Sequence, residues 1–431
     1  MSDMEANSMQ QITGRMKQDG YQVAALSCET RNAILREIAC ALTEHQAEIF
    51  AANARDMERA ERDQINPAVK KRLRFDEHKL GDVLAGISDL IAIADPVGKV
   101  LLERELDEGL VLKKISCPIG VIGIIFEARP DALVQISALC IKSGNCAVLK
   151  GGKETADTNR VLFQIIYQAA LQAGAPEGCL AQAQAHSEID ELLACDQSVD
   201  LLIPRGSNQF VQYIMNHTRI PVMGHADGVC HTYIDADADL KKALPILIDA
   251  KTQYTAACNA TETLLIQRDV ARVHLKEIAQ TLKAAGITLR GNREVLTLID
   301  ADEMGDDDYN TEYLNLILSI RIVADVDEAI AHINRFGSHH TDAIITENPE
   351  NAERFMNLVD SAGVYWNCST RFADGYRYGF GAEVGISTGK IHARGPVGLD
   401  GLVTYKYKLY GSGQIVGDYA SGRRSFHFRD R

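Results

Sequence analysis

One cysteine in a short run of small residues is the first candidate for chemistry. Cys258 lies in the segment Thr255–Thr261, TAACNAT, between an expected helix and an expected strand, and its small neighbours leave the sulfur accessible. Free thiols are mostly protonated at neutral pH, so a nucleophilic cysteine needs a nearby cation or backbone N–H groups. Lys251 is close in sequence. The chain has ten cysteines, and the alternative is that Cys258 is a small buried apolar residue.

Lys150 is the candidate for holding a phosphate. It ends an apolar run at Cys146–Leu149, where a fixed ammonium could face a ribose phosphate. Neither familiar phosphate fingerprint is present, because no GxGxxG follows a strand and Gly151-Gly152-Lys153 is followed by Glu154. The alternative is a solvated lysine at a strand end.

Two polar segments could contact a substrate. Gly337–Asp342 contains adjacent histidines, but sequence neighbours rarely share one metal ion, so the segment is interpreted as a surface loop or a substrate-contact loop. Asn367–Phe372 offers Ser369, Thr370 and Arg371, whose hydroxyls and guanidinium suit a carboxylate or phosphate. The alternative for this second segment is a capped turn with a surface arginine.

The elements that position these residues follow a strand–helix alternation. Apolar residues at four-residue steps predict an amphipathic helix over 30–60, Asn66-Pro67 opens another helix, and Lys99–Ser116 has the pattern of a β-hairpin turning at Gly109. Later apolar runs predict buried strands separated by helices, which is typical of a doubly wound α/β sheet that binds ligands at the carboxyl ends of its strands. These expected strands are Val121–Phe126, Cys146–Leu149, Leu201–Ile203, Thr261–Gln267, Leu316–Val323 and Ala343–Thr346. A further strand is expected in the alternating segment Leu402–Leu409.

Composition bounds the class of protein. The chain of 431 residues has 45 Lys plus Arg, 59 Asp plus Glu and a net charge of −14, which argues against a nucleic-acid or anionic-membrane binder. The start of the sequence carries Asp3 and Glu5 and no apolar leader, and no apolar stretch approaches the ~18 residues of a membrane span. Without a CxxC pair, the cysteines are expected to be reduced thiols of a soluble, cytoplasmic protein, and no metal site is expected.

Taken in order, these segments resemble the gamma-glutamyl phosphate reductase family (glutamate-5-semialdehyde dehydrogenases) of the aldehyde dehydrogenase superfamily. The resemblance covers most of the chain after residue 100, and its carriers are specific as a set. They are Cys117–Asp131, Leu149–Glu154, Ile203–Asn208, Gly224–Asp235, Ala257–Leu265, Gly337–Thr346 and Asn367–Gly375.

The resemblance implies an α/β fold with a Rossmann-like parallel-sheet cofactor domain, an α/β catalytic domain and a small β element for oligomerisation. The expected boundaries are 1–99 and 117–228 for the NADP-binding domain, 229–400 for the catalytic domain, and 100–116 with 401–431 for the oligomerisation hairpin and C-terminal strand. A homo-oligomer is expected, and a functional association with glutamate 5-kinase is a further possibility that the family raises.

The implied reaction is the NADPH-dependent reduction of L-glutamate 5-phosphate to L-glutamate 5-semialdehyde in proline biosynthesis, with release of phosphate. Cys258 matches the family's nucleophile, which attacks the acyl phosphate to give a thioester that hydride from the nicotinamide then reduces. The resemblance assigns cofactor contacts to Lys150, Gly206, Ser207 and Glu312. Substrate contacts are expected from Arg129, Ser369, Thr370 and Arg371.

Two departures from the wider superfamily bear on mechanism. The position of its general-base glutamate matches Val222, and loss of that base disfavours attack of water on the thioester. The superfamily's asparagine oxyanion donor aligns near Ala128. The identity of the second oxyanion donor, which would act together with the Cys258 N–H, is therefore open, and the candidates are Asn259 and Arg129. The alternatives for function are another phosphate- or CoA-linked acylating aldehyde dehydrogenase, or a non-catalytic homologue.

Overall fold

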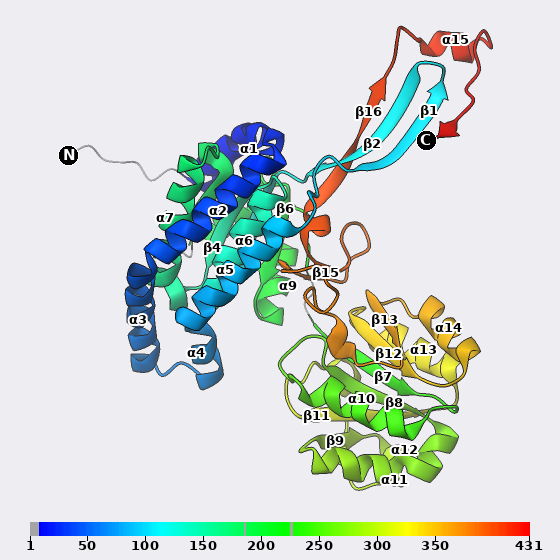
Figure 1. The fold of residues 1–431 in the computed structure, drawn as a ribbon. Helices are drawn as coiled ribbons and strands as arrows, with labels where there is room; N and C mark the ends of the chain where they lie inside the picture. The colour runs from blue at the N-terminus through cyan, green and yellow to red at the C-terminus, as the bar shows by residue number, and fades with distance from the viewer. Residues whose placement is uncertain (1–7, 185–186, 225–226) are drawn as a thin grey trace. The chain divides into compact units, whose positions relative to one another are not determined.

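A computed structural model of the chain describes residues 8–184, 187–224 and 227–431. Asp3 and Glu5, used above for the absence of a leader, lie outside the described residues, as do His225 and Ala226 of the Gly224–Asp235 motif. The described chain forms two compact units (Figure 1). Unit 1 takes the residues up to Met223 with Phe380–Gly385 and Val397–Arg431; unit 2 takes Gly224–Gly379 with Ile386–Pro396.

Unit 1 is built on a four-stranded parallel sheet in the order β5-β4-β3-β6. The inner strand β3 is buried at all six positions, as expected for a strand covered on both faces. Across the sheet, these are the third, second, first and fourth strands in chain order. The direction in which strands are added therefore reverses between β3 and β6. Sheets of this kind bind ligands at the carboxyl ends of the strands on either side of that reversal. The strands are β3 (Val121–Phe126), β4 (Cys146–Gly151), β5 (Leu180–Ala183) and β6 (Leu201–Arg205).

Helices account for most of the rest of unit 1. The helix expected over 30–60 is in fact two helices, which meet at His45. His45 caps the C-terminus of the first helix: its N–H donates to Ala41 O, but its φ of −97° and ψ of 15° leave the helical region. Ile34, Ile38 and Leu42 are buried as the apolar spacing predicted. The helices are α1 (Met9–Ala25), α2 (Cys28–Glu44), α3 (Gln46–Arg62), α4 (Pro67–Leu73), α5 (Glu77–Ala92), α6 (Pro130–Lys142), α7 (Ala156–Gln172), α8 (Ser187–Leu193) and α9 (Asn208–His217).

A separate antiparallel sheet forms an arm of unit 1, in the order β16-β2-β1-β17 (Figure 1). The predicted hairpin is confirmed as β1 (Val100–Asp107) and β2 (Leu110–Pro118), and Gly109 takes the positive φ of 70° that the turn requires. The C-terminal strand β16 (Val403–Tyr410) pairs with β2 along its length and lies at the edge of the sheet. Short α15 (Val416–Ala420) and β17 (Arg429–Asp430) complete the arm.

Unit 2 contains a seven-stranded sheet in the order β10-β9-β11-β8-β7-β12-β13, and its strand pairs are parallel. Successive residues of β8 enter opposite cores: Leu264 and Ile266 pack with α10 and α11, whereas Leu265 packs with α13 and α14. The strands are β7 (Cys230–Ile234), β8 (Thr261–Gln267), β9 (Thr288–Gly291), β10 (Asp302–Glu303), β11 (Ile317–Val323), β12 (Thr341–Ile345) and β13 (Gly363–Trp366). The helices are α10 (Leu240–Thr252), α11 (Arg268–Ala284), α12 (Arg293–Leu296), α13 (Val326–Phe336) and α14 (Pro349–Leu358).

The seven strands expected from the sequence are all present, which confirms the doubly wound α/β class. The patterns missed β5, β7, β9 and β13, which are four or five residues long. A small pair, β14 (Gly385–Ser387) and β15 (Gly395–Val397), was not expected either. Among the helices of the described chain, none has the length and apolar character needed to span a membrane.

Candidate active site

Cys258 lies on a loop, residues 253–260, that joins the end of α10 to the start of β8; we call it the Cys258 loop. The loop is tied to its surroundings by backbone contacts: the Cys230 thiol donates to Cys258 O at 3.2 Å and the Thr370 hydroxyl donates to Asn259 O at 2.7 Å. Cys258 is partly exposed. Its backbone N–H has no partner among the described residues, so it can act as an oxyanion donor.

Gly228 fixes how closely β7 approaches this loop. A Cβ at Gly228 would lie 2.1 Å from Cys258 O and 2.5 Å from its Cα, distances that real Cβ atoms do not show. The obstacle is backbone rather than a flexible side chain, so only glycine fits without moving the nucleophile. Sequence patterns gave no sign of this role, because the two residues are 30 positions apart.

His340 is the direct partner of the Cys258 sulfur. Its Nε2 lies 3.1 Å from Cys258 Sγ, and its Nδ1 lies 2.9 Å from Thr341 Oγ1. The imidazole is 1% exposed, so the surface-loop interpretation of Gly337–Asp342 is wrong for this residue. With the ring proton on Nδ1, Nε2 can accept the thiol proton and leave a thiolate beside an imidazolium.

Other cysteines differ from Cys258 in their surroundings. Burial raises the pKa of the Cys140, Cys146 and Cys179 thiols to about 12, so these sulfurs stay protonated at neutral pH. Burial likewise raises the pKa of Cys230, next to the loop, well above its usual range. Partial exposure and a histidine partner therefore single out Cys258.

The cation facing Cys258 is Arg371 rather than Lys251. Lys251 is fully buried and its Nζ lies 2.5 Å from Glu262 Oε2. Burial lowers the pKa of Arg371 most, and the positive charge of Arg377 lowers it further, whereas negative charge on Cys258 raises it. The Arg371 guanidinium is therefore within electrostatic range of the Cys258 sulfur. Arg371 is 7% exposed and its Nε donates to Gln253 Oε1 at 2.9 Å, so the surface-arginine alternative is wrong.

The other predicted residues around Asn367–Phe372 are buried and already hydrogen bonded. Ser369 caps the short helix 370–372 by accepting from Arg371 N at 3.2 Å, so the capped turn is present. Thr370 donates to Asn259 O, and Asn259 Nδ2 donates to Ala373 O at 2.8 Å. Asn259 could serve a developing oxyanion only through its second amide N–H.

In unit 1, Lys150 is the next-to-last residue of β4 and is not a solvated lysine. It is 6% exposed, its Nζ donates to Gly151 O at 2.7 Å, and burial lowers its pKa while Glu188 and Glu154 raise it. A Cβ at Gly151 would lie 2.1 Å from Asn159 Nδ2, so the backbone after Lys150 packs closely against α7. The Lys150 ammonium is therefore fixed in position near the end of the strand, where it could bind an anionic group.

Gly206 and Ser207 lie where β6 meets the N-terminus of α9, at the point where the sheet reverses its winding. Ser207 N donates to Glu127 Oε2 at 3.3 Å, and a Cβ at Gly206 would lie 2.8 Å from the same oxygen. Partial burial raises the pKa of Glu127, Ser207 N–H lowers it, and Glu154 raises it. The Ser207 N–H, which was expected to face a cofactor phosphate, is therefore hydrogen bonded to the Glu127 carboxylate. The sequence did not suggest this contact. Arg129 is exposed at the N-cap of α6.

Glu312 and Val222 complete the predicted positions. Glu312 is partly buried in the segment before β11 and raises the pKa of Glu262, so it lies near the Lys251–Glu262 pair of unit 2. Val222 is bridged to Leu202 beside β6 and offers no acid–base group.

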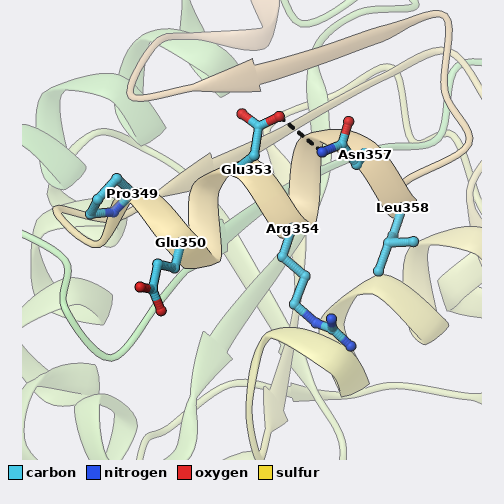
Figure 2. Close-up of a pocket in the computed structure, with 6 residues that line it drawn as sticks. All are labelled: Pro349, Glu350, Glu353, Arg354, Asn357 and Leu358. Carbon is cyan, nitrogen blue, oxygen red and sulfur yellow. Dashed lines mark hydrogen bonds between the residues drawn. The ribbon is translucent and has the colours of Figure 1, made fainter.

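Two further features carry no assignment. Within the described residues, no cluster of three or more His, Cys, Asp or Glu side chains could hold a metal ion. Figure 2 shows the side chains that line a pocket on α14, where Asn357 Nδ2 donates to Glu353 Oε1 at 2.9 Å. Arg354 of the same pocket pairs with Asp327 of α13. None of the predicted site residues lines this pocket.

Comparison with known proteins agrees with this fold. The family model described as "Aldehyde dehydrogenase family" matches residues 1–305, and the chain belongs to that family. A relative from Ruminiclostridium cellulolyticum, 53% identical over 97% of each chain, is named gamma-glutamyl phosphate reductase. The crystal structure of gamma-glutamyl phosphate reductase from Thermotoga maritima matches 95% of this chain and 100% of its own, with a TM-score of 0.93 and 35% identity.

The likeness extends more loosely across the fold. An engineered glycolyl-CoA reductase solved with bound NADP⁺ covers 93% of this chain and 96% of its own, with a TM-score of 0.64 and 14% identity. At that identity the likeness concerns the fold alone. Within the aldehyde dehydrogenase family, the chain therefore groups with the gamma-glutamyl phosphate reductases.

Proposed function

We propose that this chain reduces L-glutamate 5-phosphate to L-glutamate 5-semialdehyde and releases phosphate, using NADPH, as a step of proline biosynthesis. The observation that carries the proposal is the Cys258 sulfur held 3.1 Å from His340 Nε2 in a chain 53% identical to a gamma-glutamyl phosphate reductase. A thiolate is the nucleophile that an acyl phosphate needs to form a thioester.

The proposed first half-reaction is acyl transfer to sulfur. The Cys258 proton moves to His340 Nε2, Sγ bonds to the acyl carbon, and the bond from that carbon to the phosphate oxygen breaks. The Cys258 N–H stabilises the oxyanion of the tetrahedral species. Arg371, buried and within electrostatic range of the sulfur, can bind an anionic group of the substrate.

The proposed second half-reaction reduces the thioester. NADPH supplies a hydride when bound. The Cys258 N–H again holds the oxyanion, and collapse of the thiohemiacetal breaks the carbon–sulfur bond to give the aldehyde. The Cys258 thiolate leaves and recovers its proton from His340. Because Val222 stands where the superfamily has a general base, attack by water on the thioester is not assisted there.

The cofactor is proposed to bind at the strand ends of unit 1, whose donors fit an anion. Lys150 provides a held ammonium for the ribose phosphate, and Gly206 and Ser207 provide backbone next to the N-terminus of α9. Glu312 of unit 2 is proposed to hold the nicotinamide ribose. Apart from Glu312, cofactor binding is thus proposed for the domain 1–99 and 117–228, and catalysis for the domain 229–400.

Substrate and partner contacts complete the proposal. Arg129, Ser369, Thr370 and Arg371 are proposed to face glutamate 5-phosphate, with Asn259 as an oxyanion donor beside Cys258. The exposed edge strand β16 and the β1–β2 hairpin are proposed to pair with a second copy of the chain, because seven of eight β16 residues are exposed. Association with glutamate 5-kinase would pass the unstable acyl phosphate between the two enzymes.

The deciding experiment runs the reaction backwards. NADPH formation is followed with glutamate 5-semialdehyde and NADP⁺, with phosphate, with CoA, or with neither. We expect turnover that depends on phosphate. Turnover with CoA alone would favour a CoA-linked acylating enzyme, and absence of turnover with every acceptor would favour a non-catalytic homologue.

Removal of the thiol tests the nucleophile. In C258A we expect the rate to fall by about 10⁴-fold or more, because the covalent step is lost, while binding of NADPH followed by fluorescence is unchanged. Retained turnover in C258A would place the nucleophile elsewhere.

A further inference from the structure

Lys251 and Glu262 form a buried ion pair that the proposed reaction does not use. Lys251 Nζ lies 2.5 Å from Glu262 Oε2, and both side chains are fully buried. Removing two charges from water costs more than such a contact usually returns, and well-packed apolar residues often replace buried pairs without loss of stability. Stability alone is therefore a weak reason for a charged pair at this position.

The place of the pair in the chain suggests another role. Lys251 is in the last turn of α10, seven residues before Cys258, and Glu262 is the second residue of β8, four residues after it. The contact therefore joins the two ends of the Cys258 loop. On the far side of this loop, Cys258 O is held by the Cys230 thiol and Sγ by His340, so a change in loop position alters a 3.1 Å contact directly.

The groups that act on the pair come from two other segments. Burial raises the pKa of Glu262 to about 7, while Lys251 and the Leu314 N–H lower it and Glu312 raises it. Burial lowers the pKa of Lys251, while Glu262, Cys230 and Glu312 raise it. The pair thus lies close to the segment that carries Glu312 and to strand β7.

We propose that Lys251 and Glu262 are a positioning pair for the nucleophile: their contact fixes the separation of the ends of the Cys258 loop and so holds Cys258 Sγ within reach of His340. The inference takes from the proposed function only that Cys258 is the nucleophile, and neither residue touches the substrate.

The test replaces the pair in the full-length protein and measures the reactivity of the thiol. In K251M/E262L both charges are removed at similar volume. We expect a thermal midpoint close to that of the parent, since apolar replacement of a buried pair is often neutral. The rate of alkylation of Cys258 by iodoacetamide at fixed pH, followed by mass spectrometry of its peptide, should fall about 10-fold because the sulfur is displaced from His340. kcat should fall with it, while KM for phosphate stays unchanged.

A second pair of the same unit provides the control. Lys242 and Glu347 lie 2.8 Å apart and are half exposed, and K242M/E347L should leave both the alkylation rate and kcat as in the parent. The charge-conserving variant K251R keeps the ion pair but shifts its geometry, so it should slow alkylation several-fold, and K251R/E262D should recover part of the loss.

If folded K251M/E262L has the same Cys258 alkylation rate and the same kcat as the parent, the proposal is overturned and the pair has a purely structural role. If that variant does not fold, parental alkylation in K251R overturns it instead. Alkylation needs no substrate, so failure of the phosphate-dependent assay does not affect this result.

Discussion

The Cys258 loop of unit 2 and the turn between β6 and α9 of unit 1 present their polar groups in opposite ways. In unit 2, Cys258, Asn259, Thr370 and Arg371 are engaged with protein partners before any ligand arrives. In unit 1, Gly206 and Ser207 are exposed at the reversal of the sheet, and the Ser207 amide faces a carboxylate. Groups that perform chemistry gain from fixed geometry, whereas groups that capture and release a ligand must remain open to it.

After removal of the Cys258 thiol itself, the largest effect should come from the histidine of unit 2. In H340Q the amide keeps a polar group near Cys258 Sγ but cannot take its proton, so kcat/KM should fall by about 10²- to 10⁴-fold. Alkylation of Cys258 should slow as well, while binding of NADPH measured by fluorescence stays as in the parent. Parental turnover in H340Q would mean that the thiol is activated without the imidazole.

Displacing the backbone should cost somewhat less. In G228A the new Cβ meets Cys258 O, which forces the Cys258 loop to move by about 1 Å and should lower kcat by about 10²-fold. Overpacking should also reduce the free energy of unfolding by about 1–3 kcal/mol, measured by urea denaturation. The matched control is G389A, also in unit 2, where the nearest atom is Ser387 Oγ at 3.6 Å. Equal behaviour of the two variants would show that the loop adjusts freely.

In unit 1 we expect changes in affinity rather than in chemistry. Lys150→Met removes the ammonium proposed to bind the ribose phosphate, and loss of that charge-assisted hydrogen bond should weaken NADPH binding by about 10- to 100-fold. NADH lacks that phosphate and serves as the internal control, so its dissociation constant should change little. An equal loss for both cofactors would argue that Lys150 supports the fold of β4 rather than the phosphate.

The smallest effect should be a gain. Glu127→Gln removes the negative charge beside Ser207 N–H, so NADPH should bind about 2- to 5-fold more tightly. Because the pKa of Glu127 is raised, the parental carboxylate becomes neutral at a higher pH than an ordinary glutamate. The difference between parent and variant should therefore shrink as the pH falls, when both are titrated with NADPH by fluorescence. Weaker binding in E127Q would instead make Glu127 a ligand of the cofactor.

Long apolar runs were enough to predict much of the fold. β3 is buried on both faces and carries mostly apolar side chains, so its pattern was clear. β7 was missed because His231 and Thr232 are polar, although both are buried: His231 bonds to Asp342 and Thr232 to Thr261. A pattern of hydropathy cannot distinguish a polar residue in water from one with a buried partner.

The site shows the same limit. Cys258 could be selected by its neighbours in sequence, but His340 is 82 residues away, and its polar loop resembled a surface segment. Lys251 was considered because it is near in sequence, yet its charge is directed to Glu262. Arg371 was placed near the substrate, but its burial and its relation to the sulfur required the tertiary structure.

The edge strand β16 has a consequence for every measurement of stability. Its free edge presents unpaired backbone groups, and Tyr405, Tyr407 and Leu409 are each about half exposed. If a second chain adds to this edge, as proposed, it binds the folded state and not the unfolded one, so by mass action the thermal midpoint would rise with protein concentration. The midpoints of the variants above should therefore be compared at one concentration, and a dilution series of the parent measures the contribution of that edge.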